Sequence, residues 1–405
     1  MAPSGARAAF GYANFRYFIT ARFLVAASTE MQALAVAWQI YGMTHRPFDL
    51  GLVGLAQFLP GILLFLLAGH TADRVPRQRI LATCYAGFSL CSVLLLSLSL
   101  HPLKSVWPIY AVLLWNGIVR AFNGPASQAF LPLLVPQETF SSAIAWSSSV
   151  FQTATIFGPI AGGLVYGLAN SPIPVYCCSA VAYVVGLWMM SRVRLEPSAT
   201  PRPAASAEMV LEGLRYIWRN KTILGSISLD LFAVLLGGAV ALLPVYAREI
   251  LHAGPYALGI LRSAPGLGAV TMAIVLAHWP LRKNAGAAMM LCVVGFGVFT
   301  IAFGLSRNLL LSVAALALVG ACDMVSVVVR HTLVQLTTPD DMRGRVSAVN
   351  MVFIGASNEV GQFESGLTAQ WFGTIPAVVL GGAGTIVIVA LWAWWFPGLR
   401  KWRGI

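Results

Sequence analysis

The stretch GHTADRVPRQR, Gly69 to Arg79, decides how the rest of the chain is interpreted. It follows an apolar run from Leu50 to Ala68 and precedes another from Ile80 to Leu100. Apolar runs of about 20 residues are long enough to cross the ~30 Å hydrocarbon core of a bilayer as helices. The sequence therefore predicts a short charged turn between two membrane-length helices. The charged side chains of this turn are Asp73, Arg74, Arg77 and Arg79.

The composition of the chain is that of a protein embedded in a membrane. Of its 405 residues, 58% are hydrophobic and 10% are charged, whereas ordinary globular domains are about 25% charged. The mean hydropathy is +0.78, and apolar runs of membrane-spanning length recur from end to end. We therefore predict an all-α, multi-pass membrane protein that is surrounded by the lipid bilayer.

The net charge of +12 is distributed in the way that sets membrane topology. With the N-terminus inside, most Lys and Arg residues fall in predicted cytoplasmic segments, as the positive-inside rule requires. The predicted external loops hold few basic residues: Arg46, Lys104, Arg248 and Arg307. We expect both termini to be cytoplasmic. Because topology accounts for the basic charge, we expect no nucleic acid as a partner.

Twelve membrane spans are expected, in two six-helix bundles. Their approximate ranges are 16–41, 48–72, 80–100, 106–130, 141–168, 173–191, 223–247, 256–279, 286–305, 309–334, 345–371 and 375–396. Between the sixth and seventh spans, apolar residues at helical spacing predict an amphipathic helix along the cytoplasmic surface. These residues are Leu211, Leu214, Ile217 and Trp218. The predicted domains are an N-terminal bundle (1–191), a cytoplasmic linker (192–222) and a C-terminal bundle (223–405).

The two predicted bundles resemble each other in sequence. Pro47 to Gly51, PFDLG, recurs 208 positions later as Pro255 to Gly259, PYALG. With a shift of 203 positions, Gly158 aligns with Gly361. Many secondary transporters are built from such an internal repeat, with the substrate site between the repeats near the bilayer midplane. The repeat therefore predicts two pseudo-symmetric bundles.

The charged turn resembles a motif of a known family. From Gly69 to Arg79 it follows the approximate pattern G-x-x-x-D-R-x-x-R-R/K-x. This is similar to the loop between helices 2 and 3 of the major facilitator superfamily. In that family the loop lies on the cytoplasmic face and holds the two halves of a transporter together. The resemblance implies a cytoplasmic gate here, with Gly69, Asp73, Arg74, Arg77 and Arg79 as its residues.

The expected partner of this gate is the start of the eleventh span. Asp73 should lie close to Arg345, because backbone N–H groups and the positive end of a helix favour an anion. The arginines of the turn are expected to meet acids on the same face, Glu138 or Asp341. We expect this latch to stabilise the outward-open state and to break when the transporter opens inward.

Nine ionisable residues fall inside the predicted spans. They are Arg22, Glu30, Arg120, Asp230, Arg262, Asp323, Arg330, Glu359 and Glu364. Each costs about 2.5–3.5 kcal/mol at mid-helix on insertion scales, so these groups must pair, face a water-filled cavity or lie near helix ends. Arg22 and Arg262 are near helix ends and can snorkel to the interface. The other seven are candidates for proton coupling.

One face of the fourth span is polar, and the tenth span repeats it. The residues of this face are Asn116, Arg120, Asn123 and Ser127 in the fourth span, and Asp323, Ser326 and Arg330 in the tenth. Arg120 and Asp323 occupy equivalent positions with opposite charge. The stretch Arg120 to Gly124 resembles R-x-x-Q-G, a helix 4 motif of the superfamily whose arginine is linked to proton transfer. The alternative for both charges is an ion pair that serves assembly only.

The fifth span contains Gly158-Pro159 and Gly162-Gly163, which resemble the end of the superfamily's antiporter motif, G-P-x-x-G-G. Pro removes a backbone hydrogen bond and Gly permits close approach, so this helix can kink and pack tightly. Simple packing of small residues is the alternative reading of the motif. A substrate cavity could be lined from this half by Asn116, Asn123, Gln152 and Thr155.

The eleventh span holds two acids, Glu359 and Glu364, that the fifth span lacks. Five residues separate them by about 140° around a helix, so they cannot share one face. Glu359 is our first choice for proton binding, because a carboxyl removed from water can gain and lose a proton near neutral pH. Glu30 is the second choice. Asn358 and Gln362 are the cavity candidates of this span.

The segment from Arg330 to Asn350, with the acids that follow it, resembles the drug- and siderophore-exporting branch of the superfamily. This implies a monomeric secondary transporter of a bacterial-type cytoplasmic (inner) membrane, which exports an amphipathic small molecule in exchange for protons by alternating access. One alternative is a proton-coupled importer or facilitator of a small metabolite. The other is a membrane-embedded enzyme or receptor. The sequence contains no nucleophile–base set, ATP-binding loop or metal-type spacing, so we expect no enzyme activity, metal or cofactor.

Overall fold

The computed structural model describes residues 8–101, 103–194, 207–281 and 283–403, in which every regular element is a helix. Within these ranges the side chains of residues 65, 66, 72, 73, 207–210 and 341 are not described. The chain divides into two compact units: residues 1–43 and 59–205 form unit 1, and residues 44–58 and 206–405 form unit 2. Domain boundaries at 191 and 223 stay a prediction.

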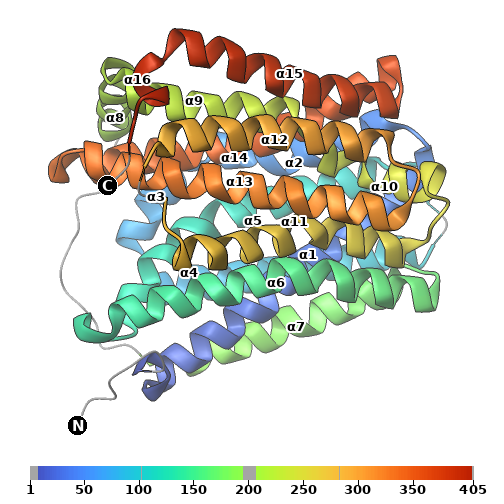
Figure 1. The fold of residues 1–405 in the computed structure, drawn as a ribbon. Coiled ribbons are helices and arrows are strands. Elements are labelled where there is room, and N and C mark those ends of the chain that lie inside the picture. Colours follow the sequence, from blue (N-terminus) through green and yellow to red (C-terminus); the bar gives the residue numbers. More distant parts are fainter. Residues whose placement is uncertain (1–7, 102, 195–206, 282, 404–405) are drawn as a thin grey trace. The chain divides into compact units, whose positions relative to one another are not determined.

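Unit 1 is built from long helices that run through the blue and green part of the chain in Figure 1. They are α1 (Ala13–Thr44), α3 (Phe65–Arg74), α4 (Arg77–Ser99), α5 (Trp107–Phe130), α6 (Phe140–Ala169) and α7 (Ile173–Arg192). Three short 3₁₀ turns accompany them: η1 (Ala8–Gly11), η2 (Leu131–Leu133) and η3 (Gln137–Thr139). The helix α2 (Pro47–Leu63) belongs to unit 2 up to Phe58 and to unit 1 from Leu59.

Unit 2 begins with the short helix α8 (Ala207–Arg219) and continues through longer ones. These are α9 (Lys221–Leu236), α11 (Pro255–His278), α12 (Ala285–Leu305), α13 (Leu309–Thr337), α14 (Asp340–Phe372) and α15 (Thr374–Trp395), followed by α16 (Pro397–Arg400). Short turns lie between α9 and α11: η4 (Ala239–Leu242), α10 (Leu243–Val245) and the π-helical η5 (Tyr246–Ile250).

All twelve predicted spans coincide with helical segments, and the all-α fold class is confirmed. Seven of the described helical segments are long and apolar enough to cross a membrane. They are Arg77–Ser99, Ile173–Arg192, Lys221–Ile250, Pro255–His278, Ala285–Leu305, Leu309–Thr337 and Thr374–Trp395. The other long helices, α1, α5, α6 and α14, carry most of the polar candidates named from the sequence, because a helix that offers polar groups to a site gives up apolar length.

Two of the predicted spans are interrupted rather than continuous. The second span breaks at Leu64, between α2 and α3, a few residues after Pro60 in the interior of α2. The seventh span breaks at Gly237 and Gly238, between α9 and η4. Both breaks follow residues that weaken a helix, because Pro removes a backbone hydrogen bond and Gly has low helix propensity.

Buried polar side chains join α1 to its neighbours in unit 1. The Ser92 hydroxyl of α4 donates to Gln32 Oε1 at 2.5 Å, and the Tyr176 hydroxyl of α7 donates to Gln39 Oε1 at 2.7 Å. In lipid the apolar side chains of two helices gain little from meeting each other, so hydrogen bonds between helices help to hold a bundle together. These pairs fix α1 between α4 and α7.

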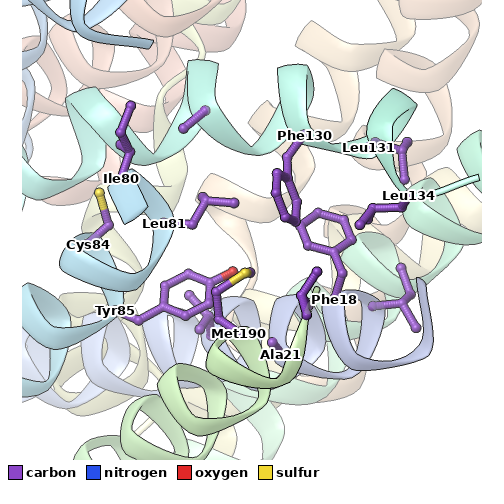
Figure 2. Close-up of a cluster of buried hydrophobic side chains, with 14 of the residues drawn as sticks. Phe18, Ala21, Ile80, Leu81, Cys84, Tyr85, Phe130, Leu131, Leu134 and Met190 are labelled. Carbon is purple, nitrogen blue, oxygen red and sulfur yellow. The ribbon is translucent and has the colours of Figure 1, made fainter. Parts of the chain in front are cut away.

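An apolar cluster packs the same helices together within unit 1 (Figure 2). Phe18 of α1 and Phe130 of α5 are fully buried, with ring centroids 5.4 Å apart. Tyr85 of α4 and Met190 of α7 lie in the same cluster, and Figure 2 shows their side chains close to each other. Aromatic pairs at this spacing add to the packing of four helices.

Glycines set the distance between α6 and α1. A Cβ atom on Gly158 would lie 2.7 Å from the Ala27 carbonyl oxygen, and one on Gly162 would lie 2.9 Å from Met31 Cα. Only glycine permits an approach this close. The G-P-x-x-G-G segment therefore packs α6 directly against α1, which is the role that its small residues alone would predict.

Glycines have the same role in unit 2. A Cβ atom on Gly320 of α13 would lie 1.9 Å from the Pro265 carbonyl oxygen of α11, and one on Gly297 of α12 would lie 2.6 Å from the Gly382 carbonyl oxygen of α15. The helices α11, α12, α13 and α15 therefore pack as neighbours within this unit. The buried core between them includes Met289, Val325, Leu333 and Trp392.

Candidate functional site

A buried ion pair joins α9 to α13 in unit 2. The Arg330 guanidinium contacts the Asp230 carboxylate, and these residues are only 2% and 5% exposed. Charged residues are almost never this buried unless they are paired. Both residues are candidates predicted from the sequence, and the structure brings them together across 100 residues of chain. Each charge is the reason the other can remain inside the unit.

A small cavity lies beside this ion pair. It holds about 10 Å³ of space, roughly the room for one water molecule. Its lining includes the carboxyl-bearing Asp230 and Asp323, together with Ser326 and Phe296. Ser326 is 2% exposed, and its hydroxyl has no hydrogen-bond partner among the described residues. A buried polar group in that condition is typical of a site that takes a water or another small polar occupant.

The charges around the cavity do not balance. Asp230 and Asp323 are acids, and the Arg330 guanidinium is a cation that interacts with both of them. With both acids ionised the set carries one excess negative charge. Binding one proton makes the set neutral, and burial favours neutral sets. The set therefore holds one acid more than a simple ion pair.

The interruption of the seventh span adjoins the same region. Ala233 and Val234, the last turn of α9 before the break, line the cavity. At the break itself, a Cβ atom on Gly238 would lie 2.7 Å from the Gly361 carbonyl oxygen of α14 and 2.8 Å from Ser365 Oγ. Irregular backbone at membrane depth is tolerated where it is buried in protein or lines a cavity. This break was not predicted from the sequence, although two adjacent glycines inside an apolar run signal one.

The acids of α14 are each hydrogen-bonded along their own helix. Gln362 Nε2 donates to Glu359 Oε2 at 3.2 Å, and Thr368 Oγ1 donates to Glu364 Oε1 at 2.6 Å. The Asn358 amide donates to the Ile354 carbonyl at 2.8 Å. Glu359 and Glu364 therefore have different partners. Gln362, the partner of Glu359, also lies against the first half of α2. A Cβ atom on Gly54 of α2 would lie 3.1 Å from Gln362 Cβ.

Unit 1 contains a second polar set, around Arg22 of α1. Arg22 Nη1 donates to Ser127 Oγ of α5 at 3.0 Å, and its guanidinium lies 5.7 Å from the centre of the Phe151 ring of α6. Arg22 therefore contacts two neighbouring helices instead of only snorkelling. From the sequence, Arg22 was expected to snorkel because it lies near a helix end, and no role was predicted for Phe151.

The other polar candidates of unit 1 lie on α1, α5 and α6. Asn116 and Asn123 each have a buried side-chain carbonyl without a hydrogen-bond partner among the described residues. Glu30 and Arg120 both interact electrostatically with the buried Tyr183, whose hydroxyl lies 3.1 Å from Thr29 Oγ1. Thr155 donates to the Gln152 backbone carbonyl at 2.8 Å, which occupies its hydroxyl proton within α6.

The charged turn has partners within unit 1. Arg77 Nη1 donates to the Ala129 carbonyl near the end of α5 at 3.2 Å, where the negative end of a helix favours a cation. Arg74 and Arg79 are exposed. The side chains of Asp73 and Asp341 are not among those described, so the predicted contact of Asp73 with the start of α14 stays a prediction. Arg345 pairs with Glu212 of α8 at 2.8 Å.

The long apolar helices, with ionisable groups held inside them, define a multi-pass membrane protein. Over residues 4–403 the chain matches the family described as transmembrane secretion effector. The chain belongs to this family, within the major facilitator superfamily. It is a transporter and not an enzyme.

Named relatives and solved structures agree with this assignment. The enterobactin exporter EntS of Shigella boydii is 27% identical over 397 residues, and that of Citrobacter koseri is 26% identical over the same length; each match covers 96% of this chain and 93% of the relative. Among solved structures, a bacterial homologue of the lysosomal transporter Spinster aligns with a TM-score of 0.73 at 14% identity, covering 96% of both chains. A bacterial homologue of the iron transporter ferroportin aligns with a TM-score of 0.71 at 13% identity, covering 94% of this chain and 98% of the other. These structures show that the fold is the major facilitator fold.

Proposed function

We propose that this protein is a proton-coupled exporter of an amphipathic small molecule of the siderophore or drug type, working by alternating access. The observation that carries the proposal is the charge-unbalanced set of Asp230, Asp323 and Arg330 around a small cavity in unit 2. The enterobactin exporters among its relatives support the direction of transport and the kind of substrate. We further propose a monomer in a bacterial inner membrane with both termini cytoplasmic. Reporter fusions at each terminus test this orientation.

The proton gradient supplies enough free energy for such export. One proton that enters down a potential of ~150 mV releases about 3.5 kcal/mol, which corresponds to a substrate gradient of a few hundredfold. Within unit 2 the coupling proton has two candidate sites. The sequence favours Glu359, and the cavity beside the ion pair favours Asp323. A neutral amide at the coupling site abolishes proton exchange without a change of shape, so the two sites can be distinguished.

The test uses the full chain in proteoliposomes with an imposed pH gradient, with enterobactin and a panel of amphipathic toxins as substrates. Wild-type protein should accumulate its substrate against a gradient of up to a few hundredfold. Asp323→Asn should reduce the accumulation ratio to about unity, because a neutral side chain cannot exchange the proton. Glu359→Gln is measured in parallel, and Asp340→Asn, an exposed acid in an i,i+3 pair, is the control.

The outcomes separate the possibilities. Loss of coupling in Glu359→Gln alone would move the proton site from Asp323 to Glu359. Wild-type coupling in both variants would contradict proton binding at either site. Substrate movement in the same direction as the protons would identify an importer and overturn the proposal of export.

A further inference from the structure

The helix α8 has one face that is held against unit 2. Gly213 and Ile217 are buried on this face. Glu212 Oε2 lies 2.8 Å from Arg345 Nη1 of α14, and the Tyr216 hydroxyl donates to the Thr337 carbonyl at the end of α13 at 3.2 Å. The amphipathic helix predicted for this segment is therefore fixed to the ends of two long helices.

The contact with α14 is close enough to transmit a displacement. A Cβ atom on Gly213 would lie 2.7 Å from the Arg345 carbonyl oxygen and 3.1 Å from Val349 Cγ2, so the two backbones touch without a side chain between them. The helices that α8 contacts carry the ionisable groups of unit 2, Arg330 on α13 and Glu359 on α14. A displacement of α8 would therefore act directly on the start of α14.

The opposite face of α8 is exposed, and its composition is that of a membrane-surface helix. Leu211, Leu214 and Trp218 follow each other at spacings of three and four residues and are 45%, 36% and 72% exposed. Arg215 and Arg219 lie beside this apolar stripe and are also exposed. A row of Leu and Trp bordered by Arg is typical of helices that lie in the membrane interface.

The chain itself places this face at the membrane surface. The membrane-spanning segment Lys221–Ile250 begins two residues after α8 ends, and Asn220 joins them by accepting hydrogen bonds from the backbone amides of Thr222 and Ile223. Figure 1 shows α8 at one end of α9. Lys221, at the junction, is exposed as well. Tryptophan and basic side chains at this depth contact lipid headgroups.

We propose that the outer face of α8 binds anionic phospholipid of the adjacent leaflet and that this lipid fixes the position of the start of α14. Leu211, Leu214 and Trp218 enter the boundary between headgroups and acyl chains. Arg215, Arg219 and Lys221 bind the headgroup phosphates. The proposal concerns lipid binding, so its failure and that of the proposed transport function are separate results.

The test measures the unfolding temperature of the detergent-solubilised full chain during titration with phosphatidylglycerol or phosphatidylcholine. Wild-type protein should be stabilised by phosphatidylglycerol at far lower concentration than by phosphatidylcholine. The triple variant Arg215→Gln, Arg219→Gln, Lys221→Gln should need roughly 100-fold more phosphatidylglycerol, because each basic side chain near an anionic surface changes affinity about fivefold. The matched control removes three other basic residues of unit 2, Arg400, Lys401 and Arg403, by the same change to Gln.

A second readout follows the start of α14 directly. Phosphatidylglycerol should slow the amide hydrogen exchange of residues 340–350 in wild-type protein and in the control variant, but not in the triple variant or in Trp218→Ser. Equal stabilisation by inorganic phosphate would show a general anion site and overturn the proposal. An equal loss of lipid response in the control variant would do the same, because it would show a diffuse effect of surface charge.

Discussion

Arg330 and Asp230 depend on each other's charge. Both are nearly inaccessible to solvent, and their contact is what allows two ionised groups to persist between α9 and α13. Replacing one partner of a buried ion pair leaves the other charge buried without compensation. Replacing both partners leaves no buried charge in the pair. The stability of unit 2 should therefore respond very differently to single and double substitutions at this pair.

We expect Asp230→Asn to destabilise the protein by about 3–5 kcal/mol, because it removes the carboxylate that the buried Arg330 guanidinium contacts directly and leaves only the more distant charge of Asp323 to balance it. Thermal unfolding in detergent measures this loss. The double variant Asp230→Asn, Arg330→Gln should recover part of it, since no net charge then remains in the pair. An Asp230→Asn protein that unfolds at the wild-type temperature would show that Asp323 alone is enough to neutralise Arg330.

The sequence predicted the identity of the buried charged residues better than it predicted their contacts. Asp230, Asp323 and Arg330 were recognisable because charge inside a membrane span is costly. Their grouping around one cavity was not, because it depends on how α9 packs against α13. Arg22 was set aside since α1 begins only nine residues earlier, yet its side chain points to Ser127 and Phe151. Position along a span does not determine the direction of a side chain.

The packing of α1 against α6 depends on glycine at the contact. Gly158 touches the backbone of α1, whereas a Cβ atom on Gly124 of α5 would meet no atom within 4 Å. The same substitution at these two positions therefore distinguishes helix packing from helix propensity.

Gly158→Ala should lower stability by about 1–3 kcal/mol, because the added methyl group must displace α6 from the Ala27 carbonyl. Gly124→Ala should be neutral or stabilising, because Ala is the better helix former by up to about 1 kcal/mol. Unfolding of both variants in one detergent measures the difference. Similar midpoints would indicate that α6 can shift without cost, and the packing role of Gly158 would be wrong.

The sequence predicted the elements themselves well and their interruptions poorly. Helix-length apolar runs fix where spans lie, because a bilayer demands about 20 apolar residues. The breaks at Leu64 and at Gly237–Gly238 fall inside such runs, where an average over apolar residues hides them. Pro60 and the paired glycines were the available signals. At Gly238 the interrupted backbone lies against Gly361, a residue more than 100 positions away in the sequence.

For the whole molecule, the sequence predicted the major facilitator fold from the charged turn and the internal repeat, and the family match over residues 4–403 confirms it. Charge distribution predicts which ends of the helices face the cytoplasm. The assignment of residues 44–58 to unit 2 could not be predicted from chain order. It follows from the close approach of Gly51 to Phe363 and of Gly54 to Gln362, both on α14.

The latch predicted at Asp73 is expected to affect the conformational equilibrium of the whole transporter. An anion at a helix N-terminus contributes about 1 kcal/mol, so its loss should shift the ratio of two states about fivefold. Asp73→Asn keeps the size of the side chain and removes its charge. We expect it to slow transport at unchanged protein level and to increase labelling, from the cytoplasmic side, of cysteines introduced at the predicted cavity positions Asn123 and Gln152. Asp340→Asn, which removes an exposed charge at the start of α14, should leave both unchanged. If Asp73→Asn transports and labels like wild type, the charged turn does not hold the cytoplasmic side closed, and its arginines serve only local contacts such as that of Arg77 with the Ala129 carbonyl.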